Sequence, residues 1–171
     1  MIFNEISQIS KYLINDVKYD TYSLFGNYYV KWLPSTHNNY KFIRIEKIEN
    51  GLFGTTINAT YRSIGSIDIR CDTNNNLADI TFWLVNDKNF VKFMNKEIYG
   101  KPLDDNDSNE IKKLLFDYAE KIAKENNCNI LRRDVHNNMR EYNESINNLG
   151  FKLTGERAKD NPFWLVTYKN I

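Results

Sequence analysis

The stretch NILRRDVHNNMREYNESINNLGF, residues 129–151, decides the fold of this chain. Its apolar start, Ile130 to Val135, predicts a β-strand. Asn138 can then cap a helix, and Gly150 suits the left-handed position just past the helix end because it has no Cβ. Phe151 can fold back onto the last turn of that helix. The buried face of the helix is expected to comprise Met139, Tyr142, Ile146 and Leu149, which repeat at helical spacing.

A long amphipathic helix is expected before this stretch. Its apolar stripe consists of Ile111, Leu114, Leu115, Tyr118 and Ile122. Asp107 and Glu110 have the spacing of a capping box, and Ser108 is an alternative cap. The pair Asn126-Asn127 is then expected to end the helix.

Strand patterns fill most of the remaining sequence. Strands are expected over residues 28–33, 40–48, 64–70, 78–85, 151–156 and 163–168. The third and fourth of these form a hairpin, because an Asn-rich turn joins them. A first helix is expected over residues 2–14, and Asn50-Gly51 is a turn signal.

The segment between residues 87 and 100 is open to two interpretations. Phe90, Phe93 and Ile98 lie at helical spacing, which favours a short helix over another strand. Asp87 is expected to cap its start and Gly100 its end.

This order of elements predicts an α+β fold in layers. A mixed, largely antiparallel central sheet is expected, flanked by helices. Residues 1–171 are expected to form one domain, because no linker or repeat divides the chain.

The composition excludes several classes of function. The chain has 23 Lys and Arg against 22 Asp and Glu, so no general attraction to nucleic acid or to a membrane surface is expected. Cys71 and Cys128 form no metal-binding motif and are expected to be reduced thiols rather than a disulfide. No metal site is expected. Without a leader pattern or a long apolar run, the chain is expected to be cytoplasmic.

The C-terminal third resembles the GNAT superfamily of acetyl-CoA-dependent N-acyltransferases. The similarity lies in the ordered set IKKLLFDYAEKIAKENN, ILRRDV, NNMREYNESINN, LGF and FWLVTYKN. The hairpin over residues 64–85 also lies where the family places its central antiparallel strands.

The resemblance implies a set of site residues. It implies that backbone groups hold the cofactor where the central strands separate, at Leu84 and Val85, and that the start of the long helix contributes Ser108, Asn109 and Lys112. Asn138 is a further implied cofactor contact. The implied catalytic pair is Tyr142, which protonates the departing thiolate, and Asp79, which deprotonates the amine, with Asp68 as the other candidate by position for this second role. For Tyr142 an ordinary core position remains an alternative, as does a solvent-facing strand position for Asp79.

Two features depart from the family pattern. The glycine-rich loop that cradles the pyrophosphate corresponds here to PLDDNDSNEIKKLL, which contains no glycine and no arginine. Ile146 stands where many members have the catalytic tyrosine, and Met139 stands where many have an asparagine. His136 follows the strand near the implied cleft and is either a base or an exposed histidine.

Two hypotheses follow. In the first, the chain uses acetyl-CoA to acylate an amine of a small molecule or peptide by direct transfer. In the second, the same fold has lost the cofactor site and serves as a binding or interaction module. Neither hypothesis involves nucleic acid or a membrane, and both leave a homodimer open.

Overall fold

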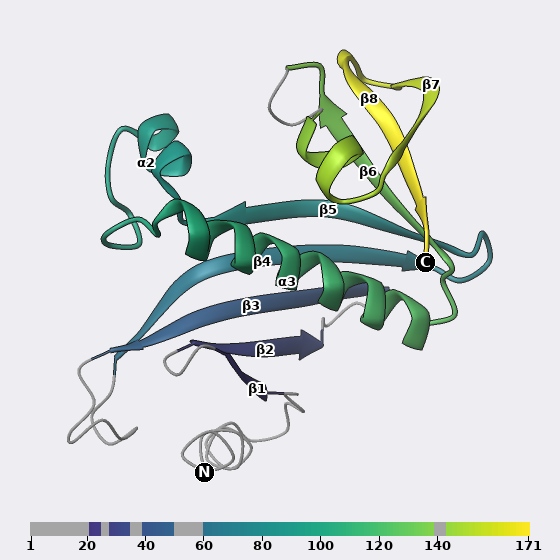
Figure 1. The fold of residues 1–171 in the computed structure, drawn as a ribbon. Helices are drawn as coiled ribbons and strands as arrows, with labels where there is room; N and C mark the ends of the chain where they lie inside the picture. Colours follow the sequence, from purple (N-terminus) through teal and green to yellow (C-terminus); the bar gives the residue numbers. More distant parts are fainter. Residues whose placement is uncertain (1–20, 25–27, 35–38, 50–59, 139–142) are drawn as a thin grey trace.

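The computed structural model describes residues 21–24, 28–34, 39–49, 60–138 and 143–171. These form one eight-stranded sheet with helices beside it (Figure 1). The strands are β1 (Thr21–Leu24), β2 (Tyr28–Pro34), β3 (Tyr40–Glu49), β4 (Thr60–Asp72), β5 (Leu77–Val85), β6 (Ile130–His136), β7 (Lys152–Ala158) and β8 (Asn161–Asn170). The helices are α2 (Lys88–Met94), α3 (Asp105–Glu125) and the π-helix η2 (Glu144–Asn148).

The strand order is β1-β2-β3-β4-β5-β6-β8-β7. Every neighbouring pair is antiparallel except β5 and β6, which run parallel. The α3 helix connects these two parallel strands, as a parallel pair requires. The expected α+β fold with a mixed, largely antiparallel sheet is confirmed.

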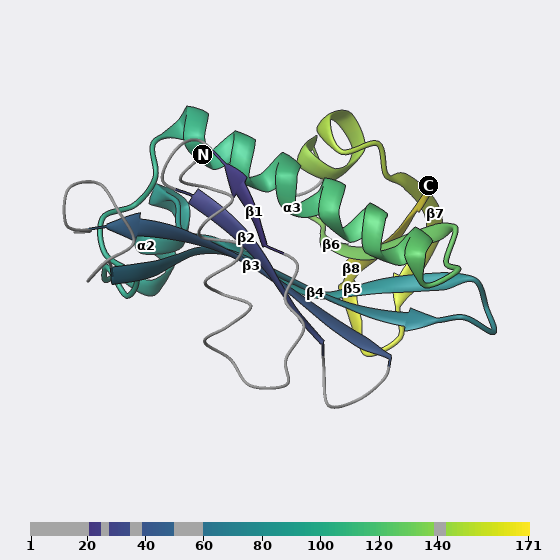
Figure 2. The same cartoon turned by 90° about the horizontal axis from the view of Figure 1, so that it is seen from below.

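The core lies between α3 and one face of the sheet (Figure 2). Alternate residues of the central strands point toward the helix because side chains on a strand alternate between faces. The fully buried apolar residues at this contact include Ile43, Ile45, Ile67, Ile69, Ala78, Ile111, Leu115, Ala119 and Leu131. Gly65 lets the helix approach closely, since a Cβ there would lie 3.0 Å from Cγ2 of Ile111.

The long helix begins earlier than its sequence indicates. Asp104 is the N-cap, and its carboxylate accepts a hydrogen bond from the backbone N–H of Asp107 at 2.8 Å. The expected capping box of Asp107 with Glu110 is therefore wrong, and Ser108 is not a cap either. The reason lies in Leu103, which is buried and donates its N–H to the carbonyl of Asn86 at 2.9 Å. This bond fixes the chain just before Asp104, so the helix starts there. Its expected end at Asn126 is confirmed.

The short helix α2 follows β5. Its expected cap is confirmed, because the Asp87 carboxylate accepts a hydrogen bond from the N–H of Phe90 at 2.8 Å. Its expected end at Gly100 is wrong. Asn95 terminates the helix in the left-handed conformation (φ 54°), which asparagine adopts more readily than most residues.

The segment after β6 differs from the expected α-helix. Its described part is a π-helix over Glu144–Asn148, and the N–H of Leu149 bonds the carbonyl of Glu144 at 3.1 Å. Gly150 has the expected left-handed backbone (φ 78°), and Phe151 is buried against the core with its ring 6.1 Å from that of Phe116. The glycine stop and the returning phenylalanine are thus confirmed.

Some expectations fall outside the described residues. These are the helix over residues 2–14, the turn at Asn50-Gly51 and the positions of Met139 and Tyr142. Cys71 and Cys128 are both buried, free thiols. No helix in the described ranges is both long and apolar enough to span a membrane.

Candidate active site between β5 and β6

The two parallel strands at the middle of the sheet stay together for only a short distance. Their pairing runs from Leu77 opposite Ile130 to Asp79 opposite Arg132 and then stops. Just beyond this point the register of β5 against β4 shifts, because Ile80 pairs with Ile69 whereas Phe82 pairs with Asp68. Thr81 is therefore the extra residue of a β-bulge. Since a bulge bends a strand and increases its twist, it accounts for the divergence of β5 from β6.

The bulge also changes which side chains of β5 face the helix. Before it, Ala78 and Ile80 point toward α3 and pack on the core. After it, Trp83 and Val85 take that face, with the Trp83 ring 5.8 Å from the ring of Phe116. One extra residue thus keeps both halves of the strand packed on the core while the strand changes direction.

The divergence leaves a cleft with a volume of about 630 Å³. Its lining comes from Ile80, Thr81, Phe82, Trp83, Leu84, Val85, Asp87, Asn89, Phe90, Phe93, Arg133, Asp134, His136, Asn138 and Trp164. Among the described strands, the half of β5 after Asp79 pairs only with β4. Backbone groups that point toward the cleft are thus available to hydrogen-bond a ligand, in the way that an edge strand accepts another chain.

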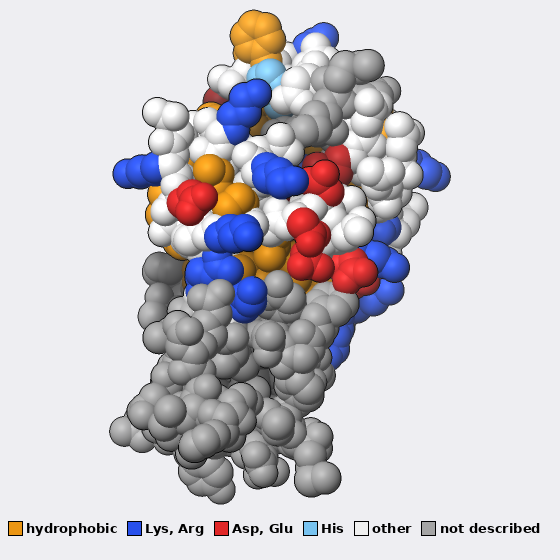
Figure 3. Space-filling model, turned by 60° about the vertical axis from the view of Figure 1, so that its left-hand side comes forward, with side chains coloured by type: hydrophobic (Ala, Val, Ile, Leu, Met, Phe, Trp, Pro, Cys, Tyr) orange, Lys and Arg blue, Asp and Glu red, His pale blue; other side chains and the backbone are white. Residues whose placement is uncertain are grey.

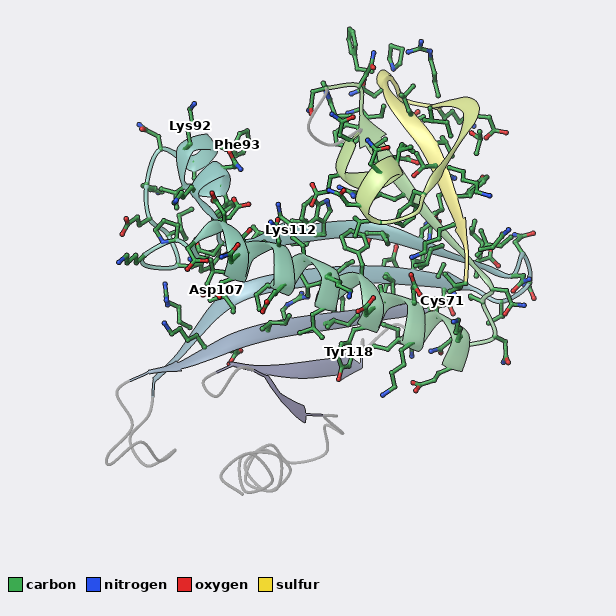
Figure 4. All side chains as sticks on the ribbon, in the orientation of Figure 1. Cys71, Lys92, Phe93, Asp107, Lys112 and Tyr118 are labelled. Atoms are coloured by element: carbon green, nitrogen blue, oxygen red, sulfur yellow. The ribbon has the colours of Figure 1, made fainter. Side chains whose placement is uncertain are left out.

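A cation joins the two walls of the cleft on the side of α3. Lys112 places its Nζ 3.4 Å from the carboxylate of Asp87, beside β5, and 3.5 Å from that of Glu144, beyond β6. The ammonium also lies 5.9 Å from the ring centre of Trp83. Figure 4 shows Lys112 on the side of α3 that borders these strands. This double ion pair is held in place by burial, since only 14% of the Lys112 side chain is exposed.

A second cation lies deeper in the same wall. Arg133 is 2% exposed, and its Nη1 donates to the Ser145 hydroxyl at 2.7 Å. Its guanidinium stacks between two aromatic rings, 4.7 Å from the centre of Trp83 and 5.2 Å from that of Phe116. Trp83 is thereby in contact with both cations, which fixes the ring at the floor of the cleft.

The opposite face of the sheet carries a row of alternating charges. Arg70 donates to Asp79 at 2.7 Å, Arg132 lies 3.6 Å from the same carboxylate, and Arg132 also bonds Asp134 at 3.2 Å. The hydrogen bond to Asp79 raises the pKa of the Arg70 guanidinium. Asp79 therefore holds two arginines in position on this face of the sheet.

The end of β6 brings an imidazole to the cleft. His136 stands edge-on to Trp164 with their ring centres 5.5 Å apart, and its Nδ1 lies 3.2 Å from Nδ2 of Asn138. Asp134 lines the cleft from the same face of β6.

The structure brings together some of the implied site residues. Leu84, Val85 and Asn138 line the cleft. Lys112 does not line the cleft itself but lies behind it, 3.4 Å from the lining residue Asp87, which also accepts a hydrogen bond from the Ser108 hydroxyl at 3.3 Å.

Two further implied residues do not line the cleft, and a third is outside the described residues. Asn109 is exposed on α3 and does not line the cleft. Asp79 lines a second cavity next to it, and Tyr142 is outside the described residues.

Sequence reasoning missed Phe90 and Phe93 as cleft residues. Both belong to α2, and their helical spacing indicates a helix but not a binding site. Phe93 is 84% exposed, and this exposure, which marks it as unusual, is not visible in a sequence. Arg133 is also a cleft residue that the sequence does not reveal, because an arginine is usually exposed, whereas the alternating burial of β6 places this one inside.

The cleft fits one part of coenzyme A and not another. Unpaired backbone along β5 and apolar walls suit the amides and methylenes of a pantetheine arm. The diphosphate does not fit the start of α3 in the family manner, because Asp104 already caps it and Asp105 and Asp107 stand in its first turn. Figure 3 shows acidic side chains grouped beside basic ones on this side of the molecule, not a uniformly basic surface.

The comparisons with known proteins find similar solved structures but no match to a protein family or to a curated protein.

Among similar solved structures is the PaiA N-acetyltransferase of Thermoplasma acidophilum in complex with coenzyme A, at 19% identity and a TM-score of 0.46, covering 78% of this chain and 62% of that one. A Klebsiella pneumoniae protein assigned as an acyl-CoA N-acyltransferase is 10% identical, with a TM-score of 0.49 and coverage of 99% and 86%. Nourseothricin acetyltransferase is 11% identical, with a TM-score of 0.45 and coverage of 90% and 82%.

The chain spans less than two thirds of the Thermoplasma protein. Each of these TM-scores is below 0.5, so the similarities assign no role to the cleft.

Proposed function

We propose that this chain transfers an acyl group from an acyl-pantetheine thioester, such as acetyl-CoA, to an amine. The observation that carries the proposal is the parting of β5 from β6 after Asp79, which opens a cleft along unpaired strand backbone. A bound thioester supplies the activated carbonyl carbon in this reaction. The protein then has to align the two reactants, which lowers the barrier mainly by removing translational freedom.

The residues of the cleft have separable tasks under this proposal. Backbone groups of Leu84 and Val85 hold the thioester arm. His136 accepts the proton that the amine loses, because an imidazole at the cleft wall is the common choice for this step. Lys112 maintains the width of the cleft through its bonds to Asp87 and Glu144.

A second function is favoured by one observation. The acidic first turn of α3 repels a diphosphate where the family binds it, which suits a chain that uses the cleft for binding without catalysis. The two functions differ in whether the cleft accepts the thioester arm.

Titration of the purified protein separates them. We expect acetyl-CoA and S-acetyl-pantetheine, which lacks the diphosphate, to bind below millimolar concentration and to raise the melting temperature. The start of α3 should contribute little to the binding of a diphosphate. The dissociation constants of the two ligands should therefore differ by no more than about tenfold, which corresponds to about 1.4 kcal/mol.

A pair of matched variants locates the site. Leu84→Trp fills the cleft and is expected to abolish the increase in melting temperature with both ligands. Leu153→Trp is the control, because Leu153 on β7 is already exposed, and it is expected to leave both increases unchanged. The absence of any shift at millimolar concentrations of either ligand would refute the acyltransferase proposal and favour the binding module.

A further inference from the structure

A second cavity opens on the sheet face that points away from α3. It has a volume of about 330 Å³ and is lined by Arg70, Asp79, Ile80, Thr81, Arg132, Asp134 and Trp164. Four of these residues, Ile80, Thr81, Asp134 and Trp164, also line the cleft. The two cavities therefore meet at the bulge of β5, where the strands begin to part.

The charges in this cavity alternate across three strands. Arg70 on β4, Asp79 on β5, and Arg132 and Asp134 on β6 form a continuous chain of contacts of 2.7, 3.6 and 3.2 Å. Asp79 is the most enclosed of the four, with 14% of its side chain exposed, and it holds both guanidinium groups in position.

The ends of the row remain accessible. The side chain of Arg70 is 49% exposed and that of Asp134 is 34% exposed. A guanidinium group carries five N–H donors, and the bonds of Arg70 and Arg132 to carboxylates use only part of them. The cavity thus presents oriented donors at one end and a carboxylate at the other, next to the cleft.

We propose that this cavity binds the acyl acceptor, and that the acceptor is an amine that also carries a carboxylate, as an amino acid or a short peptide does. The carboxylate of the acceptor pairs with Arg70 and Arg132, and its ammonium group pairs with Asp134 before it loses a proton. This inference rests on the proposed function, since it names the substrate class of the same site.

The balance of charge favours this class over a simple amine. Two arginines face two aspartates in the cavity, so a ligand that carries one charge of each sign leaves none of them without compensation. A ligand with an amine alone would desolvate the guanidinium groups without pairing them, which costs binding energy.

Asp134 brings the second cavity next to the proposed base, His136. Asp134 lines both cavities and lies two residues before His136 on the same face of β6, so an amine held there lies beside the proposed base. In the reaction the acceptor nitrogen forms the new C–N bond as the C–S bond breaks. Of the three protons of the ammonium group, one passes to His136 before the attack, one passes to the departing sulfur as the C–S bond breaks, and one stays on the amide nitrogen.

Acyl transfer to paired acceptors tests the proposal. The full chain with acetyl-CoA is offered L-leucine and L-methionine and, in parallel, their amides, which keep the amine and lack the carboxylate. We expect kcat/KM to be at least tenfold higher for the acids. Arg70→Gln should remove this preference by lowering kcat/KM for the acids at least tenfold while leaving the amides within twofold. The matched control is Arg157→Gln on exposed β7, which should change neither.

A titration without acyl donor separates this proposal from the function on which it rests. L-leucine should bind wild type and the Arg157→Gln variant alike, and Arg70→Gln at least tenfold more weakly. If acetyl-CoA fails to bind while this pattern holds, the acyltransferase function fails and the zwitterion site stands. Two results would overturn the acceptor site. One is a kcat/KM for the amino acids that is no higher than for their amides. The other is an Arg70→Gln variant that lowers kcat/KM equally for the acids and the amides.

Discussion

The two ends of β5 obey the same strand geometry but have different neighbours. The first end, Leu77 to Asp79, is bonded on both sides, to β4 and to β6, and Ala78 in its middle is fully buried. The second end, from Thr81 to Val85, keeps β4 and loses β6. Its outward residue Phe82 is 47% exposed.

The difference teaches where this fold can bind a ligand. The backbone groups of the first end are satisfied within the sheet, so its contribution is stability. The backbone of the second end has strand bonds on one side only and borders a cavity on the other, so it can serve a ligand. Changes at the first end should therefore affect unfolding, and changes at the second should affect binding and rate.

The largest effect is expected at the open end. If His136 accepts the proton of the amine, His136→Gln should lower kcat by about 10²–10⁴-fold, the usual contribution of a general base. The melting temperature should stay close to that of wild type, because His136 lies at the end of its strand and is only partly buried. Steady-state rates and a thermal melt on the same preparation check both parts. A decrease in kcat of less than tenfold would show that another group is the base.

The reverse is expected at the bonded end. Leu131 is fully buried on β6 opposite Ala78, so Leu131→Ala should lower the free energy of unfolding by about 2–5 kcal/mol. Denaturant titration measures this value. Phe82→Ala, at the open end, serves as the control and should cost under about 1 kcal/mol. Equal losses at both positions would remove the distinction between the two ends.

A smaller effect is expected at the junction between β5 and α2. Asp87→Asn keeps the shape of the side chain and can still cap α2, but it removes the charge that pairs with Lys112. We expect a loss of about 1–3 kcal/mol in unfolding free energy, the range for weakening a buried polar network. Asp105→Asn is the control, since its ion pair with Lys88 is exposed and should contribute under about 1 kcal/mol.

The effect that is smallest at neutral pH, where it is absent, concerns the bonded end and its dependence on pH. Burial raises the pKa of the Cys71 thiol to about 12, from an ordinary value of 9.0. The unfolded thiol therefore loses its proton first as pH rises, so stability that is present below pH 9 falls between about pH 9 and pH 12. One proton limits this slope to about 1.4 kcal/mol per pH unit. Unfolding free energies of wild type and Cys71→Ala, measured across this range, should converge as pH rises, and parallel curves would contradict the assignment.

Much of the fold could be predicted from patterns of residues that are close in the sequence. The glycine stop at Gly150, the return of Phe151 and the cap at Asp87 depend on residues a few positions apart, and each was predicted from the sequence. The start of α3 was not, because several successive polar residues can cap a helix. The choice of Asp104 depends on the long-range bond from Leu103 to Asn86.

The site was less accessible to sequence reasoning. Leu84, Val85 and Asn138 were identified through a resemblance, whereas the ion pairs of Asp79 with Arg70 and Arg132 depend on the register of three strands. Strand alternation also conceals a bulge, since the sequence ADITFWLV contains no glycine or proline to mark one. The position of Arg133 between two rings follows from α3 lying over β6, which no local pattern encodes.

The extra residue at Thr81 has a consequence for how this protein can change. Deletion of Thr81 would restore regular alternation and keep Trp83 and Val85 on the face of α3, but it would remove the bulge that bends β5 away from β6. Single-residue deletions in loops are usually harmless, but this deletion inside a strand would let β5 and β6 stay side by side and so narrow the cleft. Substitutions of the outward residues Phe82 and Leu84, by contrast, leave the face that packs on α3 unchanged. The cleft can therefore acquire new specificity through point mutations, while its length in residues is fixed.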